Sequence, residues 1–260
     1  MSDQEPILWQ IQVSHYSEKV RWALAHKGIE HRRRTPIPGS HIPIALWLTR
    51  GGQITFPVLE MDGRRIVDST AIIAALEERF PDAPLYPSDP GQRERALELE
   101  DFFDEEVGPH TRRLAFHELS RDPERLAPLL ERTTPAPLNR MRRISMAYAK
   151  TLTALRFAAG SAQAADRSRA KIIAGLNRLE QELGDGEYLV GDSFSVADLA
   201  AASLFYPIVL PEEGPVPPDE PPARGLQRFR ERLEGRRGFK WVAEMFRRHR
   251  KPARAASTAQ

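Results

Sequence analysis

The stretch FPVLEMDGRRIVDSTAIIAALEERF, residues 56–80, decides the fold. Its first half holds two short apolar runs on either side of Asp62-Gly63, a residue pair favoured in tight type I′ turns, and is predicted to form a β-hairpin. Its second half has the periodicity of an amphipathic helix, and Asp68 and Ser69 stand before it as competent N-terminal caps. The stretch therefore predicts strand, turn, strand and helix in direct succession.

The segments upstream extend this pattern to β-α-β-α-β-β-α within the first 80 residues. Apolar runs predict strands at 7–13 and 29–37, and helical periodicity predicts helices at 17–27 and 41–52. Two β-α-β connections favour parallel pairing of the strands that they join, and the hairpin adds an antiparallel edge.

The chain after residue 80 has a different character. Residues 81–91 hold four prolines in eleven positions, which predicts a linker. Only helical patterns follow, at 92–119 with a bend at Gly108-Pro109, at 123–137, 138–158 and 166–183, from about 195 onward, and at 224–236 and 238–250. Six prolines in residues 211–222 predict a stiff, extended connection between two of these helices.

Composition excludes several classes of protein. The chain has no cysteine, so disulfides, cysteine-ligated metals and protein thiolate nucleophiles are absent. Its seven histidines show no ligand-like spacing, and no glycine-rich phosphate loop is present, so no metal or nucleotide site is predicted. There is no apolar run of about 18 residues or more and the N-terminus is polar, so we expect a soluble, cytoplasmic protein without a membrane partner.

Charge is spread unevenly along the chain. The net charge is only +2, but residues 224–260 contain twelve basic and three acidic side chains. Such a basic tail could contact an acidic partner, but it is more often a solvated helix face with a frayed end. Nucleic acid is therefore not an expected partner.

Three segments of the chain together resemble the cytosolic glutathione transferase family. They are SHYSEKVRWALAHKGIEH (14–31), FPVLEMDGRRIVDSTAIIAALEERFP (56–81) and YLVGDSFSVADLAAASLF (188–205). The resemblance implies an α/β thioredoxin-like domain followed by an all-α helical-bundle domain. The domains expected from it are a glutathione-binding domain over 1–82, a proline-rich linker over 83–92, and a helical domain over 93–260 that is expanded at 120–165 and 211–260.

The resemblance also implies a binding site for glutathione. Phe56-Pro57 matches the family's cis-proline, beside which the backbone holds the cysteinyl part of glutathione, and Asp68-Ser69 matches the acid–serine pair that holds the γ-glutamyl head. The residue types suit this role, because a helix N-terminus attracts a carboxylate and Asp68 attracts an ammonium group. An ordinary trans proline and a simple helix cap are the alternative interpretations.

The predicted chemistry needs a hydroxyl group at the junction between the first strand and the first helix. Glutathione reacts as a thiolate, and an ordinary thiol has a pKa of about 8.5. A hydroxyl that donates a hydrogen bond to the sulfur near a helix N-terminus stabilises this anion. Ser14 matches the family's serine or cysteine position and is the first candidate; Tyr16 and Ser17 are alternatives, and a purely capping role for Ser14 is another.

Other positions are candidates for parts of the site that the resemblance does not locate. The family's usual lysine or glutamine ligand has no clear match in RGGQIT before the proline, and three residues are candidates for it: His41, Arg50 and Gln53. The electrophile pocket of the family is lined by the long helix after the linker, where the candidates are Phe102, Phe103 and His110. An aromatic pair at that spacing also suits a hydrophobic core.

Ser195 and Asp198 have a different role. They stand three residues apart before an apolar helix, in the arrangement of a capping box with Asp in place of Glu. We therefore predict a structural cap.

The function implied by the resemblance is the conjugation of glutathione to small hydrophobic electrophiles, as in detoxification, by a homodimeric enzyme that needs glutathione as co-substrate and no metal. The alternative is a protein that keeps the fold and lacks the activity, acting as a binding or scaffold module. The expanded helical part, the proline-rich segment and the basic tail motivate that alternative.

Overall fold

Four short strands form one sheet in the order β2-β1-β3-β4. Their bounds are β1 (Ile7–Trp9), β2 (Arg32–Arg34), β3 (Val58–Met61) and β4 (Arg64–Val67). β1 pairs parallel with β2 and antiparallel with β3, and β3 pairs antiparallel with β4 through the predicted hairpin. The computed structural model that gives this arrangement describes residues 5–37, 40–126, 128, 151, 159–215 and 221–250.

The prediction of parallel pairing at the second β-α-β connection is wrong. β3 lies on the far side of β1 from β2 and runs antiparallel to β1. The connection through α2 (His41–Leu48) begins where β2 ends and enters β3 at the same end of the strands, so β3 runs in the opposite direction to β2. Periodicity shows that a helix separates two strands, but it does not show at which edge the chain re-enters the sheet.

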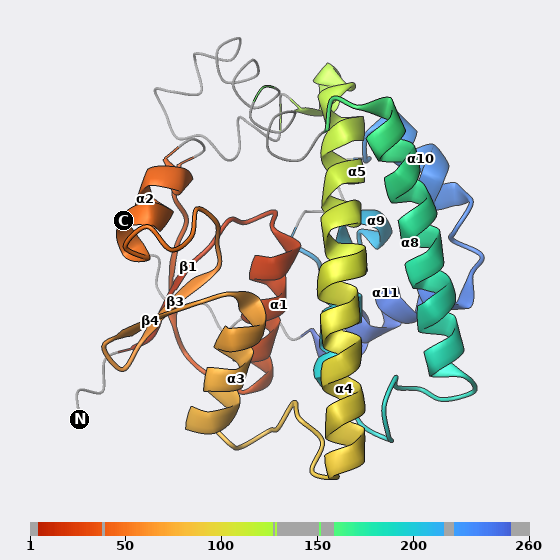
Figure 1. The fold of residues 1–260 in the computed structure, drawn as a ribbon. Coiled ribbons are helices and arrows are strands. Elements are labelled where there is room, and N and C mark those ends of the chain that lie inside the picture. Colours follow the sequence, from red (N-terminus) through yellow and green to blue (C-terminus); the bar gives the residue numbers. More distant parts are fainter. Residues whose placement is uncertain are drawn as a thin grey trace.

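Helices cover both faces of this sheet (Figure 1). Successive residues of a strand point to opposite faces, so Leu8 and Leu59 face one side while Trp9 and Val58 face the other. The first side packs against α1 (His15–His26) and α3 (Ser69–Arg79), and the second packs against α2. β1, β3 and β4 therefore each contribute to two separate layers of packing, whereas the three arginines of β2 are exposed.

A continuous column of helix begins the second part of the chain (Figure 1). It consists of α4 (Pro90–Phe102), the π-helical turn η1 (Phe103–Val107) and α5 (Gly108–Ser120). The Gly108 N–H bonds to the Phe103 carbonyl, five residues back, so the irregularity predicted at Gly108-Pro109 lies one turn earlier as a π turn.

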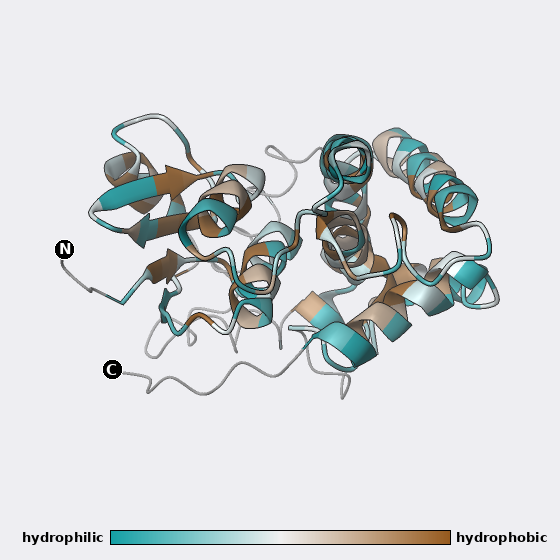
Figure 2. Cartoon of the chain, turned by 90° about the horizontal axis from the view of Figure 1, so that it is seen from below, coloured by the Kyte–Doolittle hydropathy of each residue, from teal (hydrophilic) through white to brown (hydrophobic). Residues whose placement is uncertain are grey.

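Four more helices have both ends within the described residues: α8 (Ala162–Leu183), α9 (Val196–Val209), α10 (Arg224–Glu231) and α11 (Arg237–His249). Residues 123–126 are helical as well, as predicted for the segment that begins at 123. Every residue of α9 is buried, so this helix forms the centre of the helical part. The other helices show hydrophobic and hydrophilic residues on different sides (Figure 2). Most of the predicted helices at 123–137 and 138–158, and part of the 211–222 connection, lie outside the described residues.

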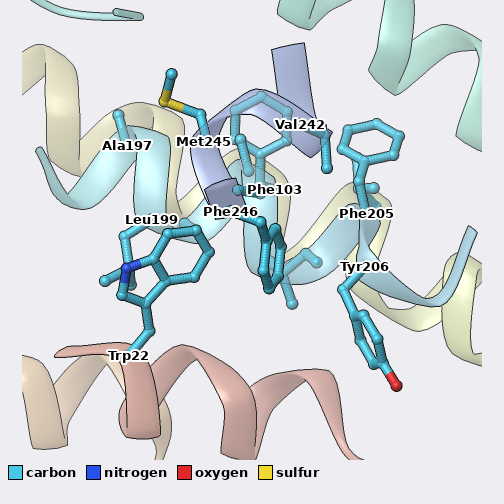
Figure 3. Packing of buried hydrophobic residues seen from close by; sticks show 14 of the residues in the cluster. Trp22, Phe103, Ala197, Leu199, Phe205, Tyr206, Val242, Met245 and Phe246 are labelled. Carbon is cyan, nitrogen blue, oxygen red and sulfur yellow. The ribbon is translucent and has the colours of Figure 1, made fainter. Parts of the chain in front are cut away.

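The hydrophobic core runs through both parts of the chain. Trp22 of α1 points from the sheet side toward Leu199 of α9 and Phe246 of α11 (Figure 3). Its ring centroid lies 4.5 Å from that of Phe246, and its indole N–H donates to the His249 carbonyl oxygen at 3.1 Å. The sheet layer and the helical part are therefore joined by direct core contact.

Candidate functional site

The register of the strands brings three segments to one end of the sheet, which we call its edge: the start of β3, the end of β1 and the end of β4. Val58, the first residue of β3, lies opposite Trp9 of β1 and Val67 of β4. Pro57 precedes Val58, so it lies at the edge where β1 and β4 end. The chain passes from these two strands into α1 and α3, which places the N-termini of both helices at the same edge.

The Phe56-Pro57 peptide bond is cis, as the sequence predicts. Both residues are buried, and Phe56 packs with Ala45 and Leu48 of α2. The helix that connects β2 to β3 thus supports the segment that enters β3.

Asp68 occupies the N-cap of α3. Its carboxylate accepts hydrogen bonds from the N–H groups of Thr70 at 2.9 Å and Ala71 at 3.2 Å. The residue has φ 76, a left-handed value that is unusual for a residue other than glycine, while Ser69 behind it is buried. Such a backbone conformation in an exposed, charged residue is a feature of functional sites.

Ser14 is the N-cap of α1. Its hydroxyl oxygen accepts a hydrogen bond from the Ser17 N–H at 3.3 Å, and the residue is half-buried. A hydroxyl has one proton to donate and two lone pairs, so this contact leaves the proton available to an acceptor outside the helix. Ser14 therefore combines a hydroxyl donor with the partial positive charge of a helix N-terminus.

The alternative hydroxyls are held inside the protein. Ser17 is completely buried and its oxygen accepts from the Ile11 N–H at 3.3 Å. The Tyr16 hydroxyl donates to the Asp104 carbonyl oxygen at 2.8 Å, and burial raises the pKa of Tyr16 above its ordinary value. The structure thus gives Ser17 no access to a ligand and gives the Tyr16 proton an internal acceptor.

His15 lies beside these hydroxyls as a neutral ring. Burial, reinforced by the charge of Arg112, lowers the pKa of His15 to about 3. Its Nε2 lies 2.9 Å from the Gly108 carbonyl oxygen, which can only accept, so Nε2 carries the proton. His15 fastens the start of α1 to the start of α5.

A buried charge cluster lies next to this edge and was not predicted. The Lys19 ammonium lies 2.7 Å from Glu100 and 2.5 Å from Asp104. The Thr70 hydroxyl accepts a hydrogen bond from Lys19 and shares its single proton between the Glu100 and Asp104 carboxylates, at 3.1 and 2.8 Å. The cluster joins α1, α3 and the α4–η1 column. The four-residue spacing of Glu100 and Asp104 places both on one helix face, a signal from which an inward-facing acidic pair could have been suspected.

Comparison with protein families identifies this arrangement. The family model for the glutathione S-transferase N-terminal domain matches residues 8–84, and that for the C-terminal domain matches residues 139–237. The chain belongs to the glutathione S-transferase family. The sheet with its three helices and the helical part that follows are the two parts of the glutathione transferase fold.

Individual relatives of this glutathione S-transferase family member differ in their described activities. A probable maleylacetoacetate isomerase of Caenorhabditis elegans is 28% identical over 208 residues, covering 79% of this chain and 80% of the relative. A glutathione S-transferase of Methylobacterium radiotolerans, solved in complex with glutathione sulfonate, is 25% identical over 99% of each chain, with a TM-score of 0.55. The beta-etherase LigF of Sphingobium sp. shares the fold, with a TM-score of 0.59 and 21% identity over 93% of this chain and 99% of LigF.

The three residues proposed from the sequence to line the electrophile pocket of this transferase lie in different surroundings. Phe103 is completely buried in the core and its ring meets that of Phe205 edge to face, which favours the core interpretation of the aromatic pair over a pocket role. Adjacent residues of a helix point about 100° apart, which is why Phe102 is half-buried while Phe103 is not exposed. His110 faces α8, where its Nδ1 lies 3.1 Å from the Ser168 hydroxyl.

The three other candidates for a glutathione ligand lie on α2 and its exit. His41 opens α2 and is half-buried, and burial lowers its pKa below the ordinary value. Arg50 is exposed, and the Gln53 N–H donates to the Thr49 hydroxyl at 2.9 Å. The role of these three residues as glutathione ligands remains a prediction.

The Ser195–Asp198 pair lies far from this edge of the sheet and caps α9. The buried Asp198 carboxylate accepts from the N–H groups of Ser195 and Leu189, both at 2.8 Å. Burial raises the pKa of Asp198 to about 6, against the effect of these hydrogen bonds. None of the described helices has the length and apolar character of a membrane span, and the described residues include no group of side chains arranged to hold a metal ion.

Proposed function

We propose that the protein is a glutathione transferase in which Ser14 activates the glutathione thiol for attack on small hydrophobic electrophiles. One observation carries the proposal: the N-termini of α1 and α3 and the cis-proline segment lie at a single edge of the sheet. Ser14 begins the first of these segments, Asp68-Ser69 the second, and Phe56-Pro57 forms the third. Family membership supports glutathione as the ligand.

In this proposal each segment holds one part of glutathione. The partial positive charge at the start of α3 attracts the γ-glutamyl carboxylate, and Asp68, whose carboxylate also caps this helix, attracts the γ-glutamyl ammonium. The backbone of Phe56 pairs with the cysteinyl part as a neighbouring strand would. These contacts direct the sulfur toward Ser14.

The chemical step is a thiolate substitution or addition. The thiol releases its proton to solvent, and the Ser14 hydroxyl donates a hydrogen bond to the sulfur anion that remains. The sulfur then forms a bond to the electrophilic carbon. In a substitution a leaving group departs with the bonding electron pair, and in an addition the product carbon takes a proton from solvent.

The test compares two serines that make the same hydrogen bond. Ser14 caps α1 and Ser161 caps α8, with N–H to Oγ distances of 3.3 and 3.2 Å. We expect Ser14→Ala to raise the pKa of bound glutathione by about one unit and to lower kcat/KM near neutral pH by about tenfold. Ser161→Ala and Tyr16→Phe should leave that pKa unchanged, as read from thiolate absorbance in the binary complex.

Two results would count against the proposal. A Tyr16→Phe variant with the larger shift would make Tyr16 the thiolate partner. A wild-type protein that is not retained on immobilised glutathione and converts no electrophile in a broad panel would leave the binding or scaffold role as the better explanation. A homodimer and a cytoplasmic location are expected from the family and stay proposals as well.

A second candidate function is glutathione-dependent isomerisation, because the Caenorhabditis elegans relative is described as a probable maleylacetoacetate isomerase. In such a reaction the thiolate adds to a double bond and is eliminated after rotation, so glutathione is regenerated. We would follow maleylacetone with a trace of glutathione by NMR. Complete conversion to the trans isomer indicates an isomerase, whereas conversion that stops when glutathione is consumed indicates conjugation.

A further inference from the structure

β2 is the outermost strand of the described sheet, and only one of its two long sides pairs with another strand, β1. On that side the Arg32 N–H donates to the Pro6 carbonyl oxygen at 2.9 Å. The Arg34 carbonyl oxygen accepts from the Gln10 N–H, also at 2.9 Å. Alternate residues of a strand bond to the same neighbour, so the N–H and C=O groups of Arg33 point away from β1. Neither group has a hydrogen-bond partner in the part of the chain that the structure describes, and we call this the open side of β2.

The side chains of β2 give its open side a strong positive charge, because all three are exposed arginines. Arg32 and Arg34 lie on one face of the sheet and Arg33 lies on the other, since successive side chains of a strand alternate. A strand added at the open side would therefore meet guanidinium groups on both of its faces. Two residues of a strand span about 6–7 Å, so carboxylates two residues apart on the added strand would match the spacing of Arg32 and Arg34.

Arg32 and Arg34 have only weak contacts with nearby groups. Arg32 lies 3.4 Å from the Glu5 carboxylate, but both side chains are well exposed, and such surface pairs contribute little. The guanidinium carbon of Arg34 lies 5.9 Å from the ring centroid of Trp9, a neutral side chain. An anionic partner can therefore bind both arginines without breaking a buried ion pair.

Arg33 lies close to two further arginines. Its Nε donates to the His31 ring at 3.3 Å, and burial lowers the pKa of His31, so this partner is neutral near pH 7. Partial burial of its guanidinium group, and then the charges of Arg21 and Arg250, lower the pKa of Arg33. The nearby Glu18 carboxylate is bonded to Arg21 at 2.7 Å and to Arg250 at 2.5 Å. No carboxylate of the described residues forms an ion pair with Arg33, so an added carboxylate would stabilise its charge.

We propose that the open side of β2 binds an extended acidic segment of a partner protein, which adds to the four-stranded sheet as a further strand. The N–H and C=O groups of Arg33 supply the main-chain hydrogen bonds, and the three arginines pair with successive carboxylates of the added strand. A second copy of this chain is disfavoured, because its own β2 would bring like charges opposite one another. Residues 251–260 contain two basic and no acidic side chains, so charge disfavours this segment as the occupant as well. The inference does not depend on the proposed function.

The first test measures the contribution of charge. The probe is a fluorescein-labelled peptide with three consecutive glutamates flanked by two valines on each side, and its binding to the full chain is followed by fluorescence anisotropy at physiological salt. We expect Arg33→Gln to weaken saturable binding by about two- to fivefold, and the combined replacement of Arg32, Arg33 and Arg34 by glutamine to weaken it by about tenfold or more. Arg64→Gln is the matched control, because Arg64 is an exposed arginine on β4, at the opposite side of the sheet.

The second test measures the main-chain hydrogen bonds. Methylation of the central glutamate nitrogen removes one peptide N–H and keeps every charge, and we expect it to weaken binding by about two- to tenfold. Hydrogen exchange of the Arg33 amide, read by NMR, should slow when the unmethylated peptide is added.

Several results would overturn the inference. Equal binding of the two peptides would mean that the arginines attract anions without adding a strand. Absence of peptide binding, or equal losses in Arg33→Gln and Arg64→Gln, would mean that the arginines only keep β2 from pairing with another copy. A slowly exchanging Arg33 amide in the free protein would mean that the open side is already covered. Tighter binding of a short poly-dT strand than of the peptide would make a nucleic acid the better occupant.

Discussion

At the scale of single residues, Lys19 is a completely buried lysine that nevertheless keeps its charge. Burial works against its charged form, but Asp104 and Glu100 outweigh that effect and hold the pKa of Lys19 above its ordinary value. Burial also raises the pKa of Glu100, and Lys19 offsets part of that rise. The two carboxylates therefore depend on one ammonium group for their charge balance, and Thr70 completes the cluster.

Removing this ammonium should leave two carboxylates buried without a cation. We expect Lys19→Met to lower the free energy of unfolding by about 3–5 kcal/mol in denaturant titration. The matched variant Lys19→Met with Glu100→Gln and Asp104→Asn removes all three charges and should recover most of that loss. A single variant as stable as the wild-type protein, or a triple variant no better than the single one, would show that charge balance is not the reason.

At the scale of elements, the sequence predicted which strands and helices exist better than how they pair. The hairpin was predictable because Asp62 and Gly63 adopt the positive φ values that their turn requires. The antiparallel partner of β1 was not, because it depends on the edge at which α2 delivers the chain. The same holds for the residues of the site. Ser14, Pro57 and Asp68 could be predicted because they lie at the ends of strands and helices, where the sequence pattern is recognisable. The contacts of Lys19 and Arg112 could not be predicted, because they are made with helices that are distant in the sequence.

The start of α3 combines a cap with a strained backbone, and the two can be separated by substitution. Asp68→Ala loses the cap, worth about 1 kcal/mol, and keeps the left-handed φ. Asp68→Gly loses the cap but relieves the strain. We therefore expect the glycine variant to be more stable than the alanine variant by about 1 kcal/mol or more in thermal unfolding, while both lose retention on immobilised glutathione.

Asp89 provides the comparison for this prediction. It caps α4 through the Gln92 N–H at 2.9 Å, but its φ of −70 is ordinary for any residue. The gap between glycine and alanine variants should be smaller at position 89 than at position 68, and neither variant there should affect glutathione binding. Equal gaps at the two positions would mean that the φ of Asp68 carries no strain.

At the scale of the whole molecule, the boundary between the expected domains at 1–82 and 93–260 is crossed by a continuous core. α3 ends at Arg79 and α4 begins at Pro90, yet Trp22 packs on residues from α9 and α11. The Arg250 guanidinium lies 2.5 Å from the buried Glu18 carboxylate of α1, which Arg21 also contacts at 2.7 Å. The end of the described chain is thus fastened to the first helix by packing and by charge.

This continuity predicts that the two parts unfold together. In the wild-type protein, far-UV circular dichroism and tryptophan fluorescence should give coincident denaturant transitions.

Trp22→Ala removes a completely buried indole that stacks on Phe194 at 5.6 Å and contacts Phe246. We expect it to lower the free energy of unfolding by about 3–5 kcal/mol and to separate the two transitions. Trp47, which is 66% exposed on α2, is the control, because Trp47→Ala creates no cavity and should leave the transitions coincident. Separate transitions in the wild-type protein, or equal effects of the two substitutions, would show that the core does not couple the two parts.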